Sequence, residues 1–189
     1  MTNLQELKLR AFQNEEVRSE YDKIKGVKMS ELLRCIEWDK TAGNSPAEKQ
    51  DLNDPYVKLS LDLVKEEVNG EDELLDSYDK GNLKGVIDGI ADVFKVLAQL
   101  CFSLDIDPEL LIKEVNDSNF SKFCTDEEQA FGSVCAYSTD DRYEGVFAEL
   151  VGDYYIIKGW KVGQNPATDK PKILKAYDYI EFNAEKFIK

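Results

Sequence analysis

Four glutamates fall within a segment that is otherwise typical of an apolar helix. Residues 59–75 carry Glu66, Glu67, Glu71 and Glu73 among Leu and Val. At about 100° per residue, Glu67 and Glu71 lie inside the apolar arc of this predicted helix, and Glu66 and Glu73 lie at its edge. A carboxylate on a buried face is costly unless a cation or hydrogen-bond donors accompany it. The segment therefore needs a positive partner.

A second predicted helix adds two more carboxylates. Asp88 and Asp92 occupy the narrow polar strip of residues 87–100, and Asp92 borders the apolar arc. Like charges at one helix junction repel each other, so a bound cation is the simplest explanation of the two helices together. Mg²⁺ suits an oxygen-only ligand set and often also holds a phosphate. Taken singly, each acid could instead be a solvated edge residue, and Glu71 could cap a broken helix.

A polar segment with a basic residue follows these helices. Asn116, Asn119 and Lys122 lie just after a predicted helix end, where they can contact phosphate and sugar oxygens. The sequence Asn-Asp-Ser-Asn is also ordinary for ending a helix, so this segment alone does not establish a ligand site.

The composition restricts the chemistry. The chain has 189 residues, no histidine and a net charge of −14. The absence of histidine excludes Ser-His-Asp and Cys-His catalysis and His-ligated zinc. The acidic balance argues against binding to nucleic acid or to an anionic membrane surface. Four scattered cysteines without a CxxC pair favour a reduced, cytoplasmic setting, and no apolar run has membrane-spanning length.

The elements that must position these residues are mainly helical. Apolar periodicity and end signals predict helices over 3–24, 28–41, 55–78, 83–104 and about 107–116. Short strands are predicted near 134–137, 145–148, 154–157 and 173–174. We therefore expect a helical domain over residues 1–124 and a β-rich C-terminal extension over 125–189. The short connection at 80–82 makes the helices before and after it antiparallel neighbours.

Several segments together resemble the all-α nucleoside triphosphate pyrophosphohydrolases, in the MazG-like and phosphoribosyl-ATP pyrophosphohydrolase-like group and its phage-type branch. The matching segments are Val64-Lys-Glu66-Glu67-Val, Asp88-Gly-Ile-Ala-Asp92, Asp105-Ile-Asp107 and Val115-Asn116-Asp-Ser118-Asn119-Phe-Ser121-Lys122. Two flanking segments are also similar to this branch: Glu37-Trp38-Asp-Lys-Thr-Ala-Gly43-Asn44 and Lys172-Ile-Leu-Lys175-Ala-Tyr177. The resemblance covers residues 30–124 well and the C-terminal part loosely.

The resemblance implies a mainly α fold, an antiparallel helical bundle of the all-α NTP pyrophosphatase type with a small β-rich C-terminal extension. It implies a hydrolase that uses Mg²⁺, with Mn²⁺ as an alternative, to convert an NTP or dNTP to NMP and pyrophosphate. It also implies a homodimer or homotetramer in the cytoplasm, or in the host cytoplasm if the chain is phage-encoded. The implied metal ligands are Glu67, Glu71, Asp88 and Asp92, and the implied catalytic carboxylates are Glu66 and Glu67. The implied substrate-binding residues are Trp38, Asn44, Asn116, Asn119, Lys122, Lys175 and Tyr177.

The sequence departs from the pattern of the group at two positions. The third glutamate of the group stands three residues after Glu67, where this chain has Gly70, so Glu71 or Glu73 must replace it. Asn116 stands where relatives often carry His. These departures and the β-rich extension leave an alternative, a non-catalytic nucleotide-binding or protein-interaction module that kept the helical fold. Release of pyrophosphate separates the two.

Overall fold

The chain divides into two compact units, each with its own packing. The computed structural model describes residues 30–189, so the predicted helix over 3–24 lies outside the described residues. The first unit, here the helical unit, ends at Glu109 apart from the terminal Lys189, and the second, the mixed unit, spans Leu110–Ile188. The division falls at 109/110, whereas the sequence led us to expect it at 124/125.

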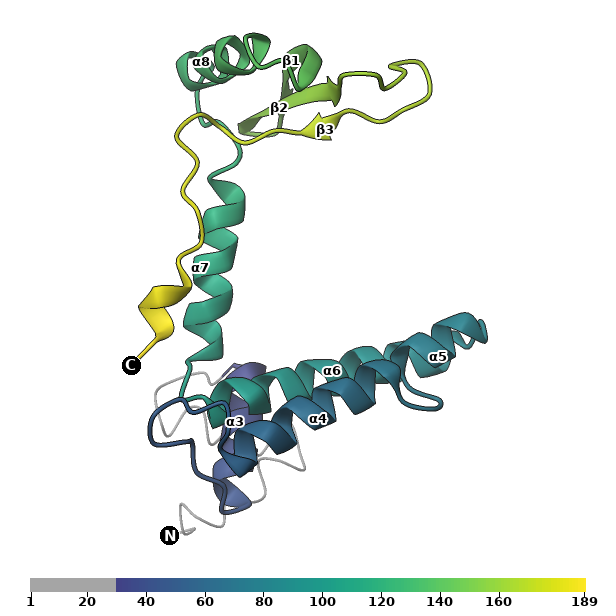
Figure 1. Cartoon of the computed structure of the whole chain (residues 1–189), viewed down its shortest axis with the longest axis vertical. Helices are drawn as coiled ribbons and strands as arrows, with labels where there is room; N and C mark the ends of the chain where they lie inside the picture. Colours follow the sequence, from purple (N-terminus) through teal and green to yellow (C-terminus); the bar gives the residue numbers. More distant parts are fainter. Residues whose placement is uncertain (1–29) are drawn as a thin grey trace, which may run out of the picture. The chain divides into compact units, whose positions relative to one another are not determined.

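The helical unit consists of α3, α4, α5 and α6 in the part of the chain that the structure describes. Their bounds are Glu31–Thr41 (α3), Pro55–Asn69 (α4), Leu74–Asp79 (α5) and Leu83–Ser103 (α6). Figure 1 shows α4 and α5 following one another beside α6, and α3 packs against α6 as well. Side-chain caps fix the helix starts: Ser30 begins α3, Asp54 and the following Pro55 begin α4, and Asn82 begins α6. This arrangement brings the acidic segments of α4 and α6 together.

The helix expected over 55–78 is broken into α4 and α5. Gly70 ends α4 with an extended backbone, and Asp72 adopts a positive φ of 64°. Glu73 is again extended and stands at the N-cap of α5. The break turns the chain between Glu67 and Glu73, so the helical angles that the sequence suggests beyond residue 70 do not apply.

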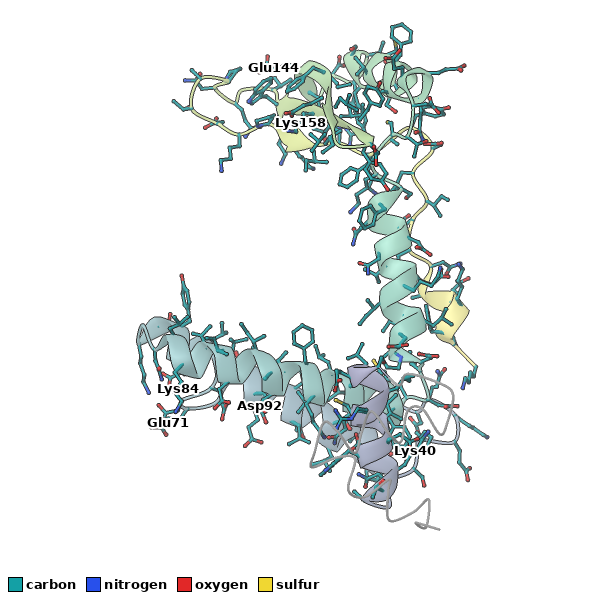
Figure 2. The ribbon with its side chains drawn as sticks, turned by 180° about the vertical axis from the view of Figure 1, so that it is seen from behind. Lys40, Glu71, Lys84, Asp92, Glu144 and Lys158 are labelled. Atoms are coloured by element: carbon teal, nitrogen blue, oxygen red, sulfur yellow. The ribbon has the colours of Figure 1, made fainter. Side chains whose placement is uncertain are left out.

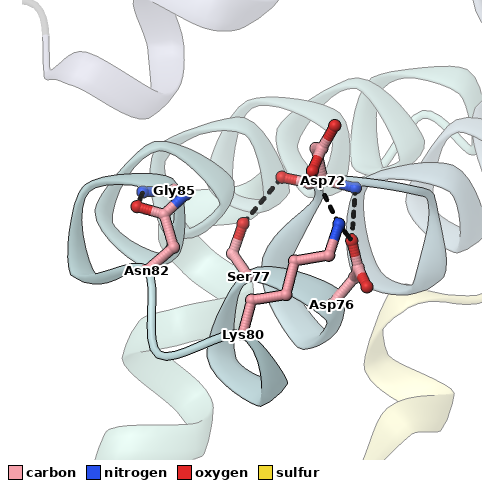
Figure 3. Close-up of polar contacts among 6 residues, drawn as sticks. All are labelled: Asp72, Asp76, Ser77, Lys80, Asn82 and Gly85. Atoms are coloured by element: carbon pink, nitrogen blue, oxygen red, sulfur yellow. Dashed lines mark hydrogen bonds and ion pairs between the residues drawn. The ribbon is translucent and has the colours of Figure 1, made fainter.

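A polar network holds the loop between the two helices (Figure 3). The backbone N–H of Asp72 donates to the Asp76 carboxylate at 2.7 Å, and the Ser77 hydroxyl donates to the Asp72 carbonyl at 2.7 Å. The Lys80 ammonium bridges the carboxylates of Asp72 and Asp76 at 2.8 and 2.7 Å. It thereby lowers the pKa of Asp76. Side chains of α5 and its C-cap thus fix the loop that leads to Glu73.

The mixed unit packs helices beside a small sheet. Its elements are α7 (Pro108–Phe120, which begins at the end of the helical unit), α8 (Glu127–Ser138), β1 (Tyr143–Val151), β2 (Tyr154–Lys161), β3 (Lys172–Ile173) and a 3₁₀ helix, η1 (Ala184–Phe187). The strands form an antiparallel sheet in the order β1-β2-β3, with a hairpin at Gly152, which has a positive φ of 60°. The core of this unit comprises Cys124, Ala130, Ile157, Leu174 and Ala176.

The expected fold class, a mainly α antiparallel bundle of the all-α pyrophosphatase type, is wrong, because the fold is mixed α/β. The sheet of the mixed unit is part of a compact α/β body that also includes α8. The strand expected over 134–137 lies within α8. The physical reason is a helix start at Asp126, whose side chain accepts from the Gln129 N–H at 2.8 Å, while the Gln129 side chain accepts from the Thr125 N–H.

Substituting Gly89 should destabilise the helical unit. A Cβ at Gly89 in α6 would lie 2.8 Å from Leu74 Cα and 2.9 Å from Leu74 N, so the backbone of α5 would have to move. We expect Gly89→Ala to lower the free energy of unfolding by about 1–3 kcal/mol, as overpacking does. Chemical denaturation followed by circular dichroism measures this.

The matched control is Gly132→Ala in α8. There the new Cβ would meet only the ring of Tyr177 at 3.2 Å, and this ring is exposed and free to turn. The intrinsic helix preference of alanine should make this variant neutral or up to about 1 kcal/mol more stable. Equal effects of the two substitutions would contradict the close packing at Gly89.

Candidate metal centre

Three carboxylates converge in the helical unit. Glu67 comes from α4, Glu73 from the N-cap of α5 and Asp92 from the middle of α6. Each can place one oxygen within 4.8 Å of an oxygen of the other two. Glu67 and Glu73 are half-buried and Asp92 is exposed. We call these three residues the acidic triad.

Two glycines allow the elements of the acidic triad to approach so closely. Gly89 lies against the backbone of Leu74, the residue that follows Glu73. A Cβ at Gly70 would lie 2.6 Å from the Glu66 carbonyl oxygen and 2.9 Å from Glu73 Cγ. Gly70, which interrupts the expected glutamate pattern, thus makes room for the side chain of Glu73.

The carboxylates of the acidic triad repel one another, because they carry the same charge and lie close together. Burial, followed by the charges of Glu73 and Asp92, raises the pKa of Glu67 above its usual value, and Glu66 adds to the effect. Within residues 30–189, no Lys or Arg forms a salt bridge with the triad. Three oxygen donors with no cationic side chain suit a hard divalent cation, and the donor set contains no sulfur or nitrogen.

The other predicted metal ligands lie outside the acidic triad. Asp88 is exposed one turn before Asp92 on α6, and Glu71 is exposed in the loop after Gly70. Figure 2 shows Glu71 near the α5 end of the unit, away from Asp92, which lies farther along α6. Of the two candidates for the third position, the structure brings Glu73 to Glu67 and Asp92. Glu66 is exposed beside Glu67 and is not a member of the triad.

A buried carboxylate that the sequence did not predict lies next to Trp38, one of the predicted substrate-binding residues. Asp39 is fully buried and accepts hydrogen bonds from the Tyr56 hydroxyl at 3.0 Å and from the Asn44 amide at 3.4 Å. Burial and the charge of Asp39 raise the pKa of Tyr56. Asp39 follows Ile36 by three residues, and this spacing on the inward face of α3 is the signal that could have revealed it.

Two predicted substrate-binding residues, Trp38 and Asn44, lie close to Asp39 but have different contacts. The Trp38 side chain is 53% exposed, and the Lys95 ammonium lies 4.3 Å from its ring centroid. Lys95 also stands 3.8 Å from Asp39 and donates to Gln99 at 2.6 Å. Trp38 thus presents a ring to solvent, whereas Asn44 is used to bind Asp39.

The remaining predicted substrate residues belong to the mixed unit. Asn119, Lys122 and Lys175 line one cavity of about 680 Å³, and the Lys122 ammonium donates to the Asn119 side chain at 2.7 Å. Asn116 is exposed on α7, and Tyr177 is exposed beside Gly132; neither residue lines the cavity. Of these five predicted substrate residues, three line the same cavity, and Asn116 and Tyr177 do not.

Comparisons with known proteins give little further information. No protein-family model matches the chain, and no solved structure matches it. Over 75 residues it is 33% identical to "Uncharacterized protein L479" of Acanthamoeba polyphaga mimivirus. The match covers 39% of this chain and 29% of that protein, so the chain spans less than a third of the relative's length. In residues 30–189, no helix has both the length and the apolar character needed to cross a membrane.

Removing one charge from the acidic triad should stabilise the metal-free protein. In chelator at pH 7.5, we expect Asp92→Asn to unfold at a temperature about 2–4 °C higher than the unchanged chain, which corresponds to roughly 1 kcal/mol. The reason is that Glu67, whose pKa is raised, ionises more easily once a neighbouring charge is gone. Differential scanning calorimetry measures the difference.

The pH dependence of this difference has a definite sign. A carboxyl with a raised folded-state pKa contributes stability at low pH and loses it as pH rises through that pKa. The advantage of Asp92→Asn should therefore shrink as pH is lowered from 7.5 to about 5, where Glu67 takes up a proton more readily. Asp62→Asn, which removes an exposed charge paired with Lys65, serves as the control and should show no such gain. A constant advantage at all pH values contradicts the repulsion account.

Proposed function

We propose that the protein is a divalent-metal-dependent nucleoside triphosphate pyrophosphohydrolase, which converts an NTP or dNTP to NMP and pyrophosphate. The observation that carries the proposal is the convergence of Glu67, Glu73 and Asp92 with no cationic side chain among them. The resemblance of the segments 64–68 and 88–92 to the all-α pyrophosphohydrolases supplies the reaction. Mg²⁺ is the proposed cofactor and Mn²⁺ its alternative.

The acidic triad would hold the cation, with Glu73 in the role that the sequence left open between two glutamates. A bound Mg²⁺ would supply an activated water and offset the phosphate charge. Hydrolysis would add water to a phosphorus of the substrate while its bond to the oxygen between the α- and β-phosphorus breaks, and the products would be NMP and pyrophosphate. Glu66, exposed next to Glu67 and outside the triad, is available to accept the proton of the water.

Activity should therefore depend on magnesium and on Asp92. We expect pyrophosphate release from NTPs to stop in chelator and to return on adding Mg²⁺ or Mn²⁺, but not with zinc alone. Asp92→Asn should lower kcat at least about 100-fold with unchanged circular dichroism, because the amide keeps the shape but not the charge.

The matched control is Asp62→Asn, which removes the same charge from an exposed position on α4 and should leave activity within about threefold. Full activity in chelator, or wild-type turnover by Asp92→Asn, contradicts the proposal. Absence of turnover with every NTP and dNTP, despite Mg²⁺ binding, favours the alternative, a non-catalytic nucleotide-binding or interaction module.

We also propose that the protein is a homo-oligomer that associates through α6. Leu83, Ile87, Ile90, Phe94 and Leu97 are between 41% and 71% exposed, although all are large and apolar. They follow one another at alternating spacings of four and three residues, which places them on one face of the helix, as in helices that pair with another helix. An apolar stripe of this kind is uncommon on the surface of a monomer. A second copy of the chain, in the cytoplasm, is the proposed occupant.

Placing a charge in the stripe should separate the subunits. We expect Ile90→Glu to reduce the molar mass measured by light scattering from that of a dimer or tetramer to that of a monomer. Leu150→Glu adds the same charge at an exposed apolar position of β1 in the mixed unit and should leave the mass unchanged. A monomeric unchanged chain at micromolar concentration contradicts association through α6.

A further inference from the structure

The cavity in the mixed unit is basic, although the chain is strongly acidic. The cavity of about 680 Å³ is lined by Lys122, Lys172, Lys175 and Arg142, and no Asp or Glu is among its lining residues. The whole chain has 38 acidic and 24 basic residues, so a cavity lined by basic residues without any acidic one is not expected from the composition. We call this cavity the basic pocket.

The lysines of the basic pocket carry charge that nothing in the described residues neutralises. Arg142 is paired with Asp140, to which it donates at 2.7 and 2.9 Å. In contrast, none of the three pocket lysines forms a salt bridge within residues 30–189. Other lysines of the same unit do pair with acids, among them Lys158 with Glu149 and Lys113 with Asp117. The pocket therefore offers three positive charges to an anion.

The lysines are held in place by backbone and side-chain contacts. Leu174, which stands between two of them, is 2% exposed, and its N–H donates to the Ile157 carbonyl at 2.8 Å. The N–H of Ala176 donates to the carbonyl of Lys122 at 3.0 Å, which ties the segment after β3 to the end of α7. The Lys175 ammonium lies 3.8 Å from the ring centroid of Tyr179. These contacts fix the backbone beside the pocket lysines, with the buried Leu174 and Ala176 on either side of Lys175.

Aromatic rings form another wall of the basic pocket. Tyr137 and Tyr143 both line it, and their rings meet edge to face with centroids 5.5 Å apart. Both rings pack against the core of the unit, so their positions are fixed. The Lys172 ammonium lies 6.0 Å from the Tyr143 ring centroid. A flat ring stacked on Tyr143 would bring an attached phosphate chain toward the lysines.

We propose that the basic pocket is a separate ligand site that binds a nucleotide, a small ligand with phosphate groups and a planar ring, without a metal ion. The volume lies within the roughly 300–1,000 Å³ typical of small-molecule sites. Unpaired lysines bind phosphate as point charges, and aromatic faces bind planar bases. The proposal goes beyond the pyrophosphohydrolase reaction, because it adds Lys172 and Tyr143 and uses no residue of the acidic triad.

Calorimetric titration of the full chain with ADP tests the proposal. The titration is carried out in chelator with the Asp92→Asn variant, so that a metal-dependent site contributes nothing. We expect ADP to bind, and Lys172→Ala/Lys175→Ala to weaken it at least about tenfold. Lys161→Ala/Lys170→Ala removes the same charge from lysines of the same unit that do not line the pocket, and it should leave affinity within about twofold. Lys172→Arg/Lys175→Arg should preserve binding, because it keeps the charge.

Two further ligands separate the contribution of the phosphate groups from that of the base. Inorganic tripolyphosphate should compete with ADP but bind more weakly, and adenosine should bind more weakly still. If tripolyphosphate binds as tightly as ADP, the proposed contact between the base and the aromatic wall is wrong. If both double-alanine variants lose the same affinity for ADP, the basic pocket is not the binding site. Failure of ADP to bind in chelator overturns the site but leaves magnesium-dependent pyrophosphate release untouched, so the two proposals fail separately.

Discussion

The close approach of α6 to the first turn of α5 is the constraint on which the helical unit depends. Because Gly89 has no side chain, the Leu74 backbone can lie directly against α6. Glu73, one residue earlier, is thereby held opposite Asp92, and Gly70 leaves the space that its side chain needs. Without this contact, Glu73 would not be held beside Glu67 and Asp92, although α4 would still pack against α6.

The two units use opposite electrostatic arrangements. Within residues 30–189, the acidic triad gathers negative charge with no Lys or Arg in a salt bridge to it, while the basic pocket of the mixed unit gathers lysines with no acid among its lining residues. Other charged residues in the described part of the chain form exposed pairs, as Lys80 does with Asp72 and Asp76. Because exposed pairs of that kind contribute little, the unpaired sets carry more information about function than the salt bridges do.

The sequence predicted α3, α4 and α6, whose starts carry local signals. The starts of α3, α4 and α6 follow from Ser30, Asp54 and Asn82, which bond to nearby backbone N–H groups. A broken helix capped by Glu71 was only an alternative in the sequence, because apolar periodicity continues through Gly70 and only tertiary packing shows that Leu74 belongs to another helix. Helix α8 was taken for a strand because Val134 and Tyr137 favour strands, although the capping at Asp126 favours a helix.

The site could be predicted only where the helices are continuous. Glu67 and Asp92 stand on unbroken stretches of α4 and α6, so their helical angles were meaningful and the structure brings them together. Glu71 lies beyond the break. The helical angles placed Glu71 on the apolar face beside Glu67, but the structure brings Glu73 there instead. The resemblance to an all-α group could not predict the mixed α/β fold, since it covers residues 30–124 well and the region of the sheet only loosely. Asp39 escaped notice because its signal in the sequence is a single three-residue spacing from Ile36, with no second acid on the same face of α3.

The interior of the helical unit also affects how this sequence can diverge. Ser60, Ser77 and Ser103 are fully buried, and each hydroxyl donates to a backbone carbonyl of its own segment. Exchange of such a serine for alanine or cysteine changes little volume and leaves no partner side chain unsatisfied. The glycines at 70 and 89 tolerate no such exchange. Sequences that diverge from this one should therefore change their buried serines early and keep the spacing of these two glycines. That spacing should then identify distant relatives better than the composition of the core does.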